Sequence, residues 1–426
     1  MRITIFTIGT RGDVQPYAVL GKALANRGHD VTLSTAKNFG ELVKKYQLKF
    51  HPVDVDFEEI LISQEGEKIM KGNPFTIQKS LNKLLFPIVE RSLNKFYQLA
   101  QTSDLIIYRP KTLADVFLKE VNTKAIMAAV VPAMEETAAF INPNFSGFKL
   151  PCFMNRWSYK LNQFRYRVFK KPISSFQLKN GLEENIPVHP NEIPCIYGIS
   201  PHFLERPEDW SENHLLTGFW LSSNKAKLNP DLLSFLKAGS PPILITFGSM
   251  PIKKEIALMI LKAISNIKER FLIVAGWANW DIELPDFHDS STVKIVESVP
   301  YETVCPLVKA VVHHGGIGTT AECLRAGKPM FPCPVIYPMG DQSFWAELAY
   351  KKGIAVKPVP LSKLTEKVFV QKIRELITDL SLYKNSKALA EQLNAEDGLQ
   401  KAIDFIESYS QSPDSSAIAV AEPLAS

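Results

Sequence analysis

Hydrophobic positions along the chain fall into two recurring patterns, short β-branched runs and longer stretches at helical spacing. The run from Ile3 to Ile8 ends at Gly9, and apolar residues at helical spacing then continue to Gly28. A second short run follows from Val31 to Thr35. A strand, a helix and a strand in this order predict a βαβ unit at the beginning of the chain.

The same alternation continues through the first half of the chain and then restarts. Strands that alternate with helices form mostly parallel sheets with helices on both faces, so the pattern predicts two successive α/β domains. In the first half we expect further strands at residues 105–108 and 125–131. In the second half we expect a helix at about 253–268 and strands at residues 243–247, 271–275, 293–296 and 310–313.

A segment with Pro and Ser separates the two patterns, and the end of the chain differs in composition from both. Helical patterns at residues 366–379 and 399–409 either close the second domain or return to the first. The last segment is rich in Ser, Ala and Pro, so we expect a disordered tail with little to bury. The expected division is a first domain at residues 1–221, a linker at 222–240, a second domain at 241–409 and a tail at 410–426.

Composition narrows the class of protein. Hydrophobic residues make up 46% and charged residues 22% of the 426 residues, which is typical of a folded, soluble chain. The formal net charge is +5, which over this length is too small for a dedicated nucleic-acid-binding protein. We therefore expect no nucleic-acid partner.

Signal-peptide, transmembrane and cysteine patterns bear on the cellular compartment of the protein. The N-terminal apolar run meets Arg11 and Asp13 before a signal peptide could be completed. The longest run without a polar residue, Ala125 to Met134, is well short of the roughly 20 residues that span a bilayer. The five cysteines are odd in number and contain no C-x-x-C pair, which indicates neither a disulfide framework nor a zinc ribbon. We expect a cytoplasmic protein without a transmembrane helix.

The first glycine loop, Gly9 to Pro16, joins a strand to a helix, where doubly wound folds bind ligands. It has neither the G-x-G-x-x-G pattern of a dinucleotide site nor the G-x-x-x-x-G-K-[ST] pattern of a P-loop. The missing dinucleotide pattern argues against an NAD site, and the missing P-loop pattern excludes a P-loop NTPase. Asp13 stands just before a helix, where a carboxylate is commonly an N-terminal cap or a partner of the helix dipole.

The second glycine loop, His313 to Glu322, follows a buried strand and opens a helix. Unpaired backbone N–H groups and the positive end of the helix dipole favour a diphosphate at such a position. His314 can donate a hydrogen bond to it, and Glu322, two turns into the helix, can accept from a ribose diol. Because no further ligands follow at metal spacing, the alternative of a metal site is disfavoured.

Three motifs in these regions resemble those of a known family. The segment from Val299 to Gln342 is similar to the nucleotide-sugar signature of the UDP-glycosyltransferases. Gly9 to Pro16 resembles the start of the sterol glucosyltransferase and glycopeptide-antibiotic glycosyltransferase branch, and Thr246 to Ser249 resembles the start of the second domain. The resemblance covers most of the chain and implies an α/β GT-B architecture, in which two Rossmann-like domains face each other across a cleft.

The resemblance also implies roles for individual residues in binding the donor. The loop residues and Ser249 would hold the diphosphate, and Glu322 would bind the ribose. Many plant members stack a Trp on the base, but here a backbone group near Val299 would have to recognise it. The full set of implied donor-binding residues is Ser249, Val299, His314, Gly316, Gly318, Thr319, Glu322, Asp341 and Gln342, of which the last two would bind the sugar hydroxyls.

The reaction that the resemblance implies is transfer of a sugar, with glucose the first choice because of Gln342, from a UDP-sugar to an acceptor hydroxyl. In this branch Asp13 acts as the general base, and a desolvated cleft that raises its pKa would make it a better base. Retaining enzymes carry Glu-x7-Glu, whereas Met330 stands eight residues past Glu322, so we expect inversion. The helix end and His314 would stabilise the leaving group, so we expect neither a metal nor another cofactor.

Three alternatives share parts of this pattern. A glycosyltransferase of a polyketide, a flavonoid or another secondary metabolite would use the same donor site with another acceptor. A GT-B nucleotide-sugar epimerase or hydrolase would share the diphosphate loop without a lipophilic acceptor pocket. A non-enzymatic nucleotide-sugar-binding or lipid-binding protein would not need Asp13.

The segment from Thr137 to Leu182 is basic and aromatic, with no Asp or Glu, eight Lys or Arg and ten aromatic residues. Apolar residues recur in it at helical spacing, namely Met154, Trp157, Leu161, Phe164 and Val168. Polar and basic residues follow the same spacing on another face, namely Arg156, Lys160, Gln163 and Arg167. This predicts a basic amphipathic helix, which in the simplest interpretation packs on its own domain with a solvated basic side.

A second interpretation of this segment is functional. Its aromatic side chains would line or cover an apolar acceptor site. Its cations would dock on an anionic membrane, so that the protein sits peripherally at the inner face of that membrane. The sterol branch has an aromatic-rich segment at the corresponding place, which favours a sterol or a similar lipophilic alcohol as acceptor. The acceptor-binding candidates are Trp157, Phe140 and Phe148.

Overall fold

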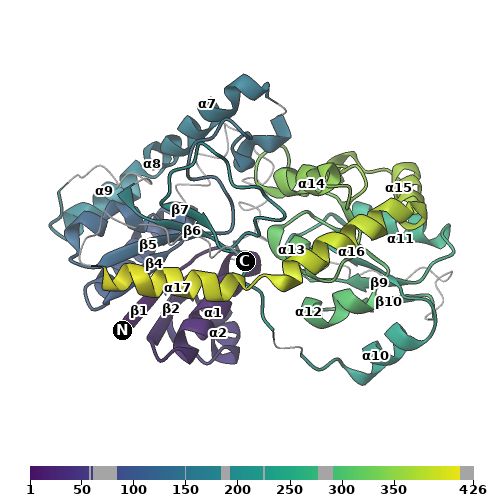
Figure 1. Cartoon of the computed structure of the whole chain (residues 1–426), viewed down its shortest axis with the longest axis horizontal. Coiled ribbons are helices and arrows are strands. Elements are labelled where there is room, and N and C mark those ends of the chain that lie inside the picture. Colours follow the sequence, from purple (N-terminus) through teal and green to yellow (C-terminus); the bar gives the residue numbers. More distant parts are fainter. Residues whose placement is uncertain are drawn as a thin grey trace, which may run out of the picture.

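Two parallel sheets with flanking helices form two domains that lie side by side (Figure 1). The computed structural model describes residues 1–56, 59–60, 84–148, 150–183, 192–223, 226–276 and 291–412. Residues 413–426, most of the expected tail, lie outside the described residues. The expected fold class, an α/β protein with two domains of the GT-B kind, is confirmed.

The first domain has a seven-stranded sheet whose neighbours all run parallel, in the order β3-β2-β1-β4-β5-β6-β7. The strands are β1 (Arg2–Phe6), β2 (Asp30–Ala36), β3 (Lys49–Val53), β4 (Leu105–Tyr108), β5 (Lys124–Ala129), β6 (Cys195–Tyr197) and β7 (His214–Leu216). Central strands such as β4 are buried along their whole length and form continuous apolar runs, which is why the pattern locates them. The sequence analysis missed β3, which contains Pro52, and the three-residue strands β6 and β7.

The second domain has a five-stranded parallel sheet in the order β10-β9-β8-β11-β12. Its strands are β8 (Ile243–Thr246), β9 (Phe271–Val274), β10 (Val293–Val296), β11 (Ala310–His313) and β12 (Met330–Pro332). The strands predicted here agree with β8 to β11 to within one residue at each end. Crossover helices bury both faces of this sheet, as parallel sheets require.

Helices cover both sheets. Those of the first domain are α1 (Arg11–Asn26), α2 (Gly40–Lys45), α6 (Phe86–Ala100), α7 (Asn155–Lys160), α8 (Phe164–Val168) and α9 (Lys170–Lys179). The following ones are α10 (Pro230–Lys237), α11 (Lys254–Ser265), α12 (Tyr301–Val304), α13 (Ile317–Arg325), α14 (Gln342–Lys351), α15 (Glu366–Thr378), α16 (Leu380–Ala395) and α17 (Gly398–Gln411). Helices α1 and α13 start directly after β1 and β11, so both glycine loops lie at carboxyl ends of strands.

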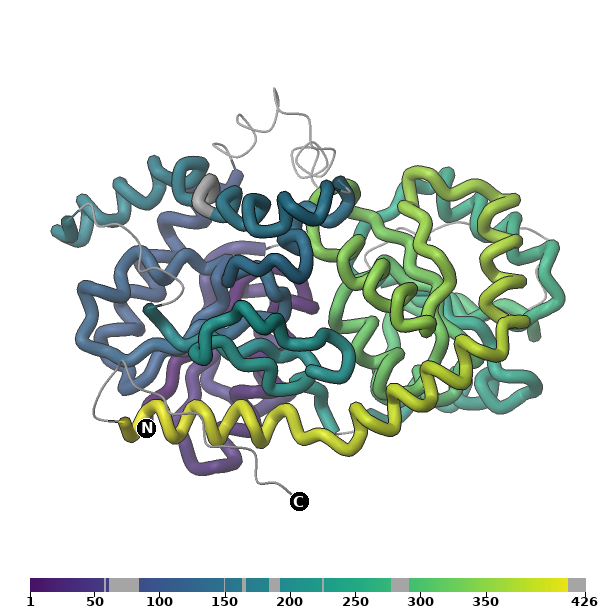
Figure 2. The backbone as a smooth tube through the Cα atoms, turned by 45° about the horizontal axis from the view of Figure 1, so that its top comes forward, coloured from purple at the N-terminus to yellow at the C-terminus, as the bar shows by residue number. Residues whose placement is uncertain are grey.

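The last helix, α17, returns to the first domain, which answers the question that the sequence left open. Figure 2 shows it in yellow, running from the second domain along the first. Glu407 on α17 pairs with Arg27 at 2.9 Å and with His29 at 3.0 Å. Lys124 donates to carbonyl oxygens at the end of the same helix, including Ser410 O at 3.0 Å. The helix therefore belongs structurally to the domain that begins the chain.

Part of the expected linker is folded. Residues 230–237 form α10, whose apolar side chains Leu232, Phe235 and Leu236 are buried. The guanidinium of Arg270 lies 4.2 Å from the centre of the Phe235 ring. This contact attaches α10 to the beginning of β9 in the second domain.

Candidate active site

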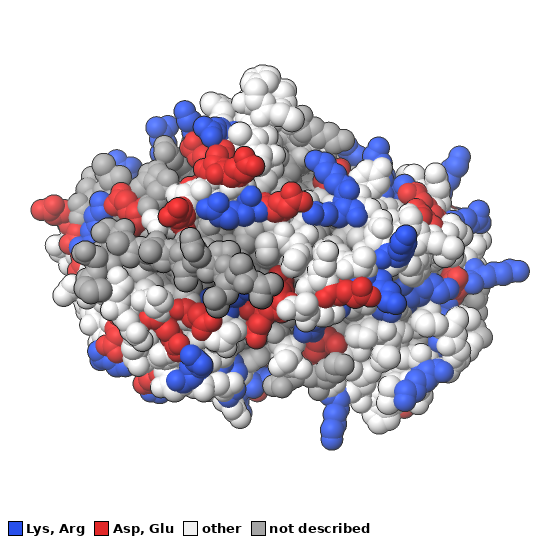
Figure 3. Space-filling model, in the orientation of Figure 1, with Lys and Arg blue, Asp and Glu red and all other residues white. Residues whose placement is uncertain are grey.

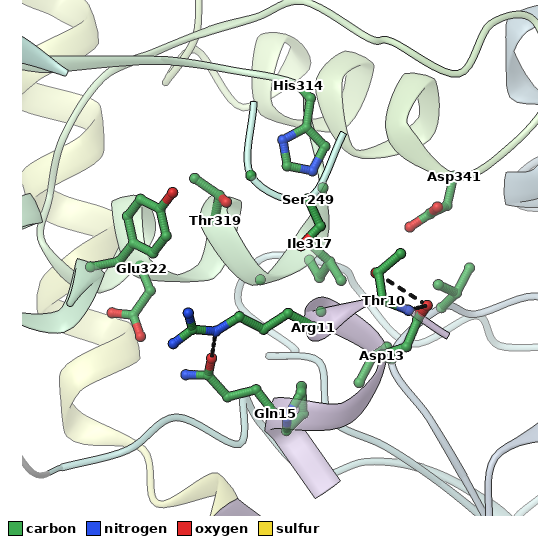
Figure 4. A pocket seen from close by; sticks show the side chains of 18 of the residues that line it. Thr10, Arg11, Asp13, Gln15, Ser249, His314, Ile317, Thr319, Glu322 and Asp341 are labelled. Atoms are coloured by element: carbon green, nitrogen blue, oxygen red, sulfur yellow. Dashed lines mark hydrogen bonds between the residues drawn. The ribbon is translucent and has the colours of Figure 1, made fainter. Parts of the chain in front are cut away.

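The two glycine loops face each other across the cleft between the domains and enclose a cavity of about 220 Å³, the donor cavity (Figure 4). The start of α1 forms one wall. The start of α13 and the loop after β8 form the opposite wall. The described residues at this cavity include nine of the expected site positions, namely Asp13, Ser249, His314, Gly316, Gly318, Thr319, Glu322, Asp341 and Gln342.

The N-terminus of α13 points its free backbone N–H groups into the donor cavity, because Gly316 is the N-cap residue. A Cβ placed on Gly318 would meet no heavy atom within 4 Å, so this backbone is open to a ligand. The His314 ring lies between Gly248 and Gly316, and a Cβ on Gly316 would overlap it. Glycine at 316 is thus required for His314 to point into the cavity (Figure 4).

The adjacent residues His313 and His314 lie in different environments. Burial lowers the pKa of His314 to about 4, so at neutral pH its ring is an uncharged donor. His313 is fully buried, and its Nδ1 accepts a hydrogen bond from the Gly315 N–H at 3.1 Å. His313 is therefore a core residue, and of the two histidines only His314 lines the cavity.

Glu322 lies at the far end of the donor cavity from Asp341 (Figure 4). Burial raises its pKa to about 7, although Arg325, 2.5 Å away, acts in the opposite direction. Arg325 also donates to Ser222 O at 2.7 Å, which ties this carboxylate to the chain that connects the domains. Glu322 can accept hydrogen bonds from hydroxyl groups when it is ionised.

Asp341 and Gln342 stand at the start of α14, and both have structural contacts. Asp341 Oδ2 accepts from Trp345 Nε1 at 2.8 Å, and its carboxylate points into the cavity in Figure 4. Gln342 Oε1 accepts from the N–H groups of Val335 at 2.7 Å and Ile336 at 3.0 Å. Only the amide nitrogen of Gln342 therefore remains to donate towards the cavity.

Base recognition by a backbone group near Val299 stays a prediction. Val299 is buried in the apolar core and does not appear among the residues at the donor cavity. Tyr301, two residues on, does line it, and its hydroxyl lies 2.6 Å from Thr246 Oγ1. The sequence analysis assigned no role to Tyr301.

Asp13 is held by three groups from the first domain. Its Oδ2 accepts from the Thr10 N–H at 2.8 Å, so the expected capping role at the start of α1 is present. Its Oδ1 pairs with Arg109, which is buried at the end of β4, and lies 3.6 Å from Lys111 Nζ. A carboxylate offers about four acceptor positions, so it can still accept from a substrate hydroxyl.

The pKa of Asp13 differs from the expectation. Burial alone would raise it, but the charges of Arg109 and Lys111 and the Thr10 hydrogen bonds outweigh burial and leave the pKa below its ordinary value. The raised pKa expected from a desolvated cleft is therefore wrong. The sequence could not show this, because Arg109 is 96 positions away along the chain.

A second, more apolar cavity of about 560 Å³, the acceptor-side cavity, adjoins the first within the first domain. Helix α6 contributes Ile88 and Val89 to it, and Leu85 directly precedes this helix. The two cavities share five polar or charged residues, namely Thr10, Asp13, Arg109, Lys111 and Asp341. Asp13 therefore stands where a donor-side space meets an apolar one.

The three acceptor-binding candidates are not among the residues at this cavity. Trp157 is 50% and Phe148 48% exposed, while the Phe140 ring packs against Phe344 at 5.1 Å between centroids. The aromatic residues of the same segment that do line the cavity are Phe145 and Phe169. Their sequence spacing gave no signal that separated them from their neighbours.

Neither a metal cluster nor a membrane span is apparent in the part of the chain that the structure describes. Its His, Cys, Asp and Glu side chains form no group of three or more that could hold a metal ion. None of its helices has the length and apolarity needed to cross a bilayer.

Comparisons with known proteins identify the two halves of the chain. Residues 3–137 match the glycosyltransferase family 28 N-terminal domain, and residues 211–405 match the UDP-glucoronosyl and UDP-glucosyl transferase family. The chain thus carries domains of two glycosyltransferase families in a GT-B fold. It is therefore a glycosyltransferase enzyme.

The relatives of this glycosyltransferase include enzymes named for an antibiotic substrate and enzymes named for sterols. It is 28% identical to an O-mycaminosyltylonolide 6-deoxyallosyltransferase of Streptomyces fradiae, over 96% of this chain and 98% of that one. It is 29% identical to a sterol 3-beta-glucosyltransferase of Arabidopsis thaliana, over 95% of this chain and 67% of that one. A sterol 3-beta-glucosyltransferase of Candida albicans is 27% identical, but this chain spans only 27% of its length.

Solved structures show the same fold. The glycotransferase of kitacinnamycin has a TM-score of 0.68 at 17% identity, over 96% of this glycosyltransferase and 98% of that chain. The glycosyltransferase VinC, solved in complex with dTDP, has a TM-score of 0.65 at 18% identity, over 96% and 100%. At these identities the likeness establishes the architecture alone.

Proposed function

We propose that this glycosyltransferase moves glucose from UDP-glucose to the hydroxyl of a lipophilic acceptor such as a sterol, with inversion. One observation carries the proposal. Asp13 lies at the junction of the donor cavity and the acceptor-side cavity. The volume of the apolar cavity is within the range of about 300–1,000 Å³ that is usual for small-molecule sites.

In the proposed reaction, Asp13 accepts the proton of the acceptor hydroxyl as its oxygen bonds to the anomeric carbon of the donor. The bond from that carbon to the diphosphate breaks, and the nucleoside diphosphate leaves with the electron pair. The N-terminus of α13, Thr319 and neutral His314 stabilise its charge, and the proposal assigns no role to a metal. Asp341 and the Gln342 amide hold the sugar.

The test combines a product screen with one substitution. A panel of UDP- and TDP-sugars is incubated with sterol, macrolide, polyphenol and glycolipid acceptors, and products are detected by mass spectrometry. Asp13→Asn keeps the shape and the cap but removes proton acceptance, so turnover should fall by about 10²- to 10⁴-fold while UDP affinity stays nearly unchanged. Near-normal turnover of the variant would exclude Asp13 as base.

A macrolide or related secondary metabolite is the second candidate acceptor. The Streptomyces relative named for a tylonolide substrate has nearly the length of this chain, whereas the sterol-enzyme relatives are longer. A clear preference for macrolides and TDP-sugars in the screen would favour it. UDP release without any acceptor would instead favour a hydrolase or an epimerase, and no product with any donor would favour a binding protein.

We also propose that the segment around α7 docks on an anionic membrane. The tip over α7 shows no charged side chain in the view of Figure 3. Phe153, just before α7, is 85% exposed, and Trp157 on α7 is half-exposed. The exposed cations of the segment with no ion pair among the described residues are Lys160, Arg167, Lys170 and Lys171. Arg156 is not one of them, since it pairs with Asp209 at 2.8 Å.

Vesicles that contain phosphatidylserine test this docking. Phe153→Ser with Trp157→Ser should weaken binding about tenfold or more, since each apolar side chain contributes about 1.5–3 kcal/mol on burial. The matched control is Leu380→Ser on α16, a residue that is 78% exposed. Equal binding by the double variant and the control would remove the membrane from the proposal.

A further inference from the structure

Positive charge around the donor cavity comes from one domain only. Among the described residues that line it, no second-domain residue is Lys or Arg, and three are acidic. All the lining cations, Arg11, Arg109 and Lys111, belong to the first domain. The wall proposed to hold the diphosphate therefore offers backbone N–H groups and a neutral imidazole, but no cationic side chain.

Two of the three cations already have an anionic partner. Arg109 is buried against Asp13, and Lys111 Nζ lies 3.6 Å from the same carboxylate. Arg11 forms no ion pair with any residue that the structure describes, although its side chain has a hydrogen-bond partner on its own helix. Its Nε donates to Gln15 Oε1 at 2.9 Å, one turn along α1. The positive charge of Arg11 is thus paired with no carboxylate among the described residues.

Arg11 extends across the cleft. In Figure 4 its side chain runs from the start of α1 towards Glu322 on the second domain. Its charge also acts on Tyr301, another second-domain residue, whose pKa burial raises to about 12 while the Thr246 hydrogen bond and Arg11 oppose the rise. The guanidinium is therefore within electrostatic reach of the wall that it faces.

We propose that Arg11 binds the diphosphate of the donor from the first domain, so that the donor site is complete only when both domains contribute. The inference rests on the proposed nucleotide-sugar donor. A guanidinium forms two parallel hydrogen bonds with a phosphate, which a lysine cannot match. Donor bound to the second domain then attracts the start of α1 and places Asp13, two residues further on, beside the reacting carbon.

Calorimetric titration with UDP and with uridine tests the role of Arg11. Hydrogen bonds to charged groups contribute about 1.5–3 kcal/mol, so Arg11→Gln should weaken UDP binding by about 10- to 100-fold. Uridine lacks phosphate, so its affinity should change less than about twofold. Arg11→Lys keeps the charge but cannot form the two parallel hydrogen bonds. Its UDP affinity should therefore lie between those of the wild type and Arg11→Gln. The matched control is Lys22→Gln on the same helix, whose Nζ donates to Gln47 at 2.7 Å outside the cavity.

Each outcome has a defined meaning. Loss of UDP affinity in Arg11→Gln alone, with uridine affinity and the melting temperature unchanged, supports the inference. Wild-type UDP binding that Arg11→Gln leaves intact, or an equal loss for uridine, overturns it without touching the proposed function. A wild-type protein that binds neither UDP nor TDP overturns the proposed function and the inference together.

Discussion

The ion pair between Asp13 and Arg109 is the feature at the residue scale that most affects the chemistry. Both side chains are largely buried, so each compensates the desolvation of the other. The pKa of Asp13 is lowered, which keeps the carboxylate ionised throughout the neutral range. The stabilisation from this pair is complete above the unfolded pKa of about 3.9 and is lost only as pH falls through the lower folded value.

Removal of the Arg109 charge should change both stability and the pH profile. Arg109→Met leaves a buried carboxylate unpaired, which costs about 3–5 kcal/mol in the free energy of unfolding. Burial then dominates and the pKa of Asp13 rises. The acid limb of the pH profile of kcat/KM should therefore shift to a higher pH than in the wild type. Chemical denaturation and a pH–rate profile measure the two effects. Arg109→Met with Asp13→Asn should recover stability without activity, and an unshifted acid limb in the single variant would contradict the argument.

Glu322 predicts a pH dependence of donor binding. Burial raises its pKa to about 7, so the neutral form predominates below that pH and the ionised form above it. If the ionised form binds the ribose diol, UDP affinity should fall about tenfold from pH 8 to pH 6, in proportion to the ionised fraction. His314 does not titrate in this window, since its pKa is about 4.

Titration of the nucleotide itself has to be separated from that of Glu322. The terminal phosphate of UDP ionises near pH 6, as phosphate monoesters do. Glu322→Gln supplies the comparison, since it keeps the size of the side chain and removes its titration. A pH dependence of the same steepness in Glu322→Gln would show that the nucleotide, and not this carboxylate, causes it.

At the scale of elements, the segment from α7 to α8 shows how contacts override a sequence pattern. The apolar stripe predicted Trp157 on the buried face, yet the buried residues of α7 are Asn155, Ser158 and Tyr159. Ser158 Oγ accepts from the Asn142 N–H at 2.9 Å, and Asn155 donates to Ala138 O at 2.8 Å. Hydrogen bonds with the loop beneath, together with burial of Tyr159, therefore favour the side of α7 that faces inward.

Helix α17 depends on a lysine at its C-terminus. Lys124 Nζ donates to the carbonyl oxygens of Tyr409 and Ser410 in the last turn and of Ser412 just after it. Carbonyl groups of the last turn lack helical N–H partners, and the ammonium charge also opposes the negative end of the dipole. Lys124→Met should lower the free energy of unfolding of α17 by about 1–2 kcal/mol. Hydrogen exchange along α17 measures this loss. The control Lys119→Met removes an exposed lysine of the same domain, and equal exchange in both variants would contradict the capping role.

At the scale of the whole molecule, the two domains are joined by two chain crossings that touch. Gly218 lies after β7, and Gly398 begins α17. A Cβ on Gly398 would lie 2.5 Å from the Gly218 carbonyl carbon, and one on Gly218 would lie 2.7 Å from Gly398 Cα. The backbones therefore pack directly against each other between the domains, where no side chain fits.

Gly398→Ala should disturb the relation between the domains. The extra methyl forces the crossings apart, which costs about 1–3 kcal/mol as overpacking does, and it should lower kcat by separating Arg11 and Asp13 from the second domain. Small-angle scattering with and without UDP detects the altered arrangement. The control Gly181→Ala adds a methyl group in open space at a φ of +65°, a strain that Gly398→Ala lacks, so it tests glycine replacement away from the crossings under harsher backbone conditions. Identical scattering and turnover in wild type and Gly398→Ala would contradict a role of the contact between the two crossings.

The sequence by itself determined the two-domain α/β fold, most central strands and the donor-side loop. Continuous apolar runs identify buried parallel strands such as β4 and β11, and the order of strand, glycine loop and helix places His314 and Glu322 at a helix N-terminus. These features depend on residues close together in the chain. The expected tail and most site roles remain predictions.

Only the tertiary structure decided how distant residues act on one another. Arg109 meets Asp13 because β4 lies next to β1 in the sheet, and this neighbour reverses the direction of the expected pKa shift. The helix α17 returns to the first domain, Val299 enters the core, and Phe145 instead of Trp157 lines the acceptor-side cavity. Burial and charge at a site are sums over all neighbours in space, and most of those neighbours are far away in the sequence.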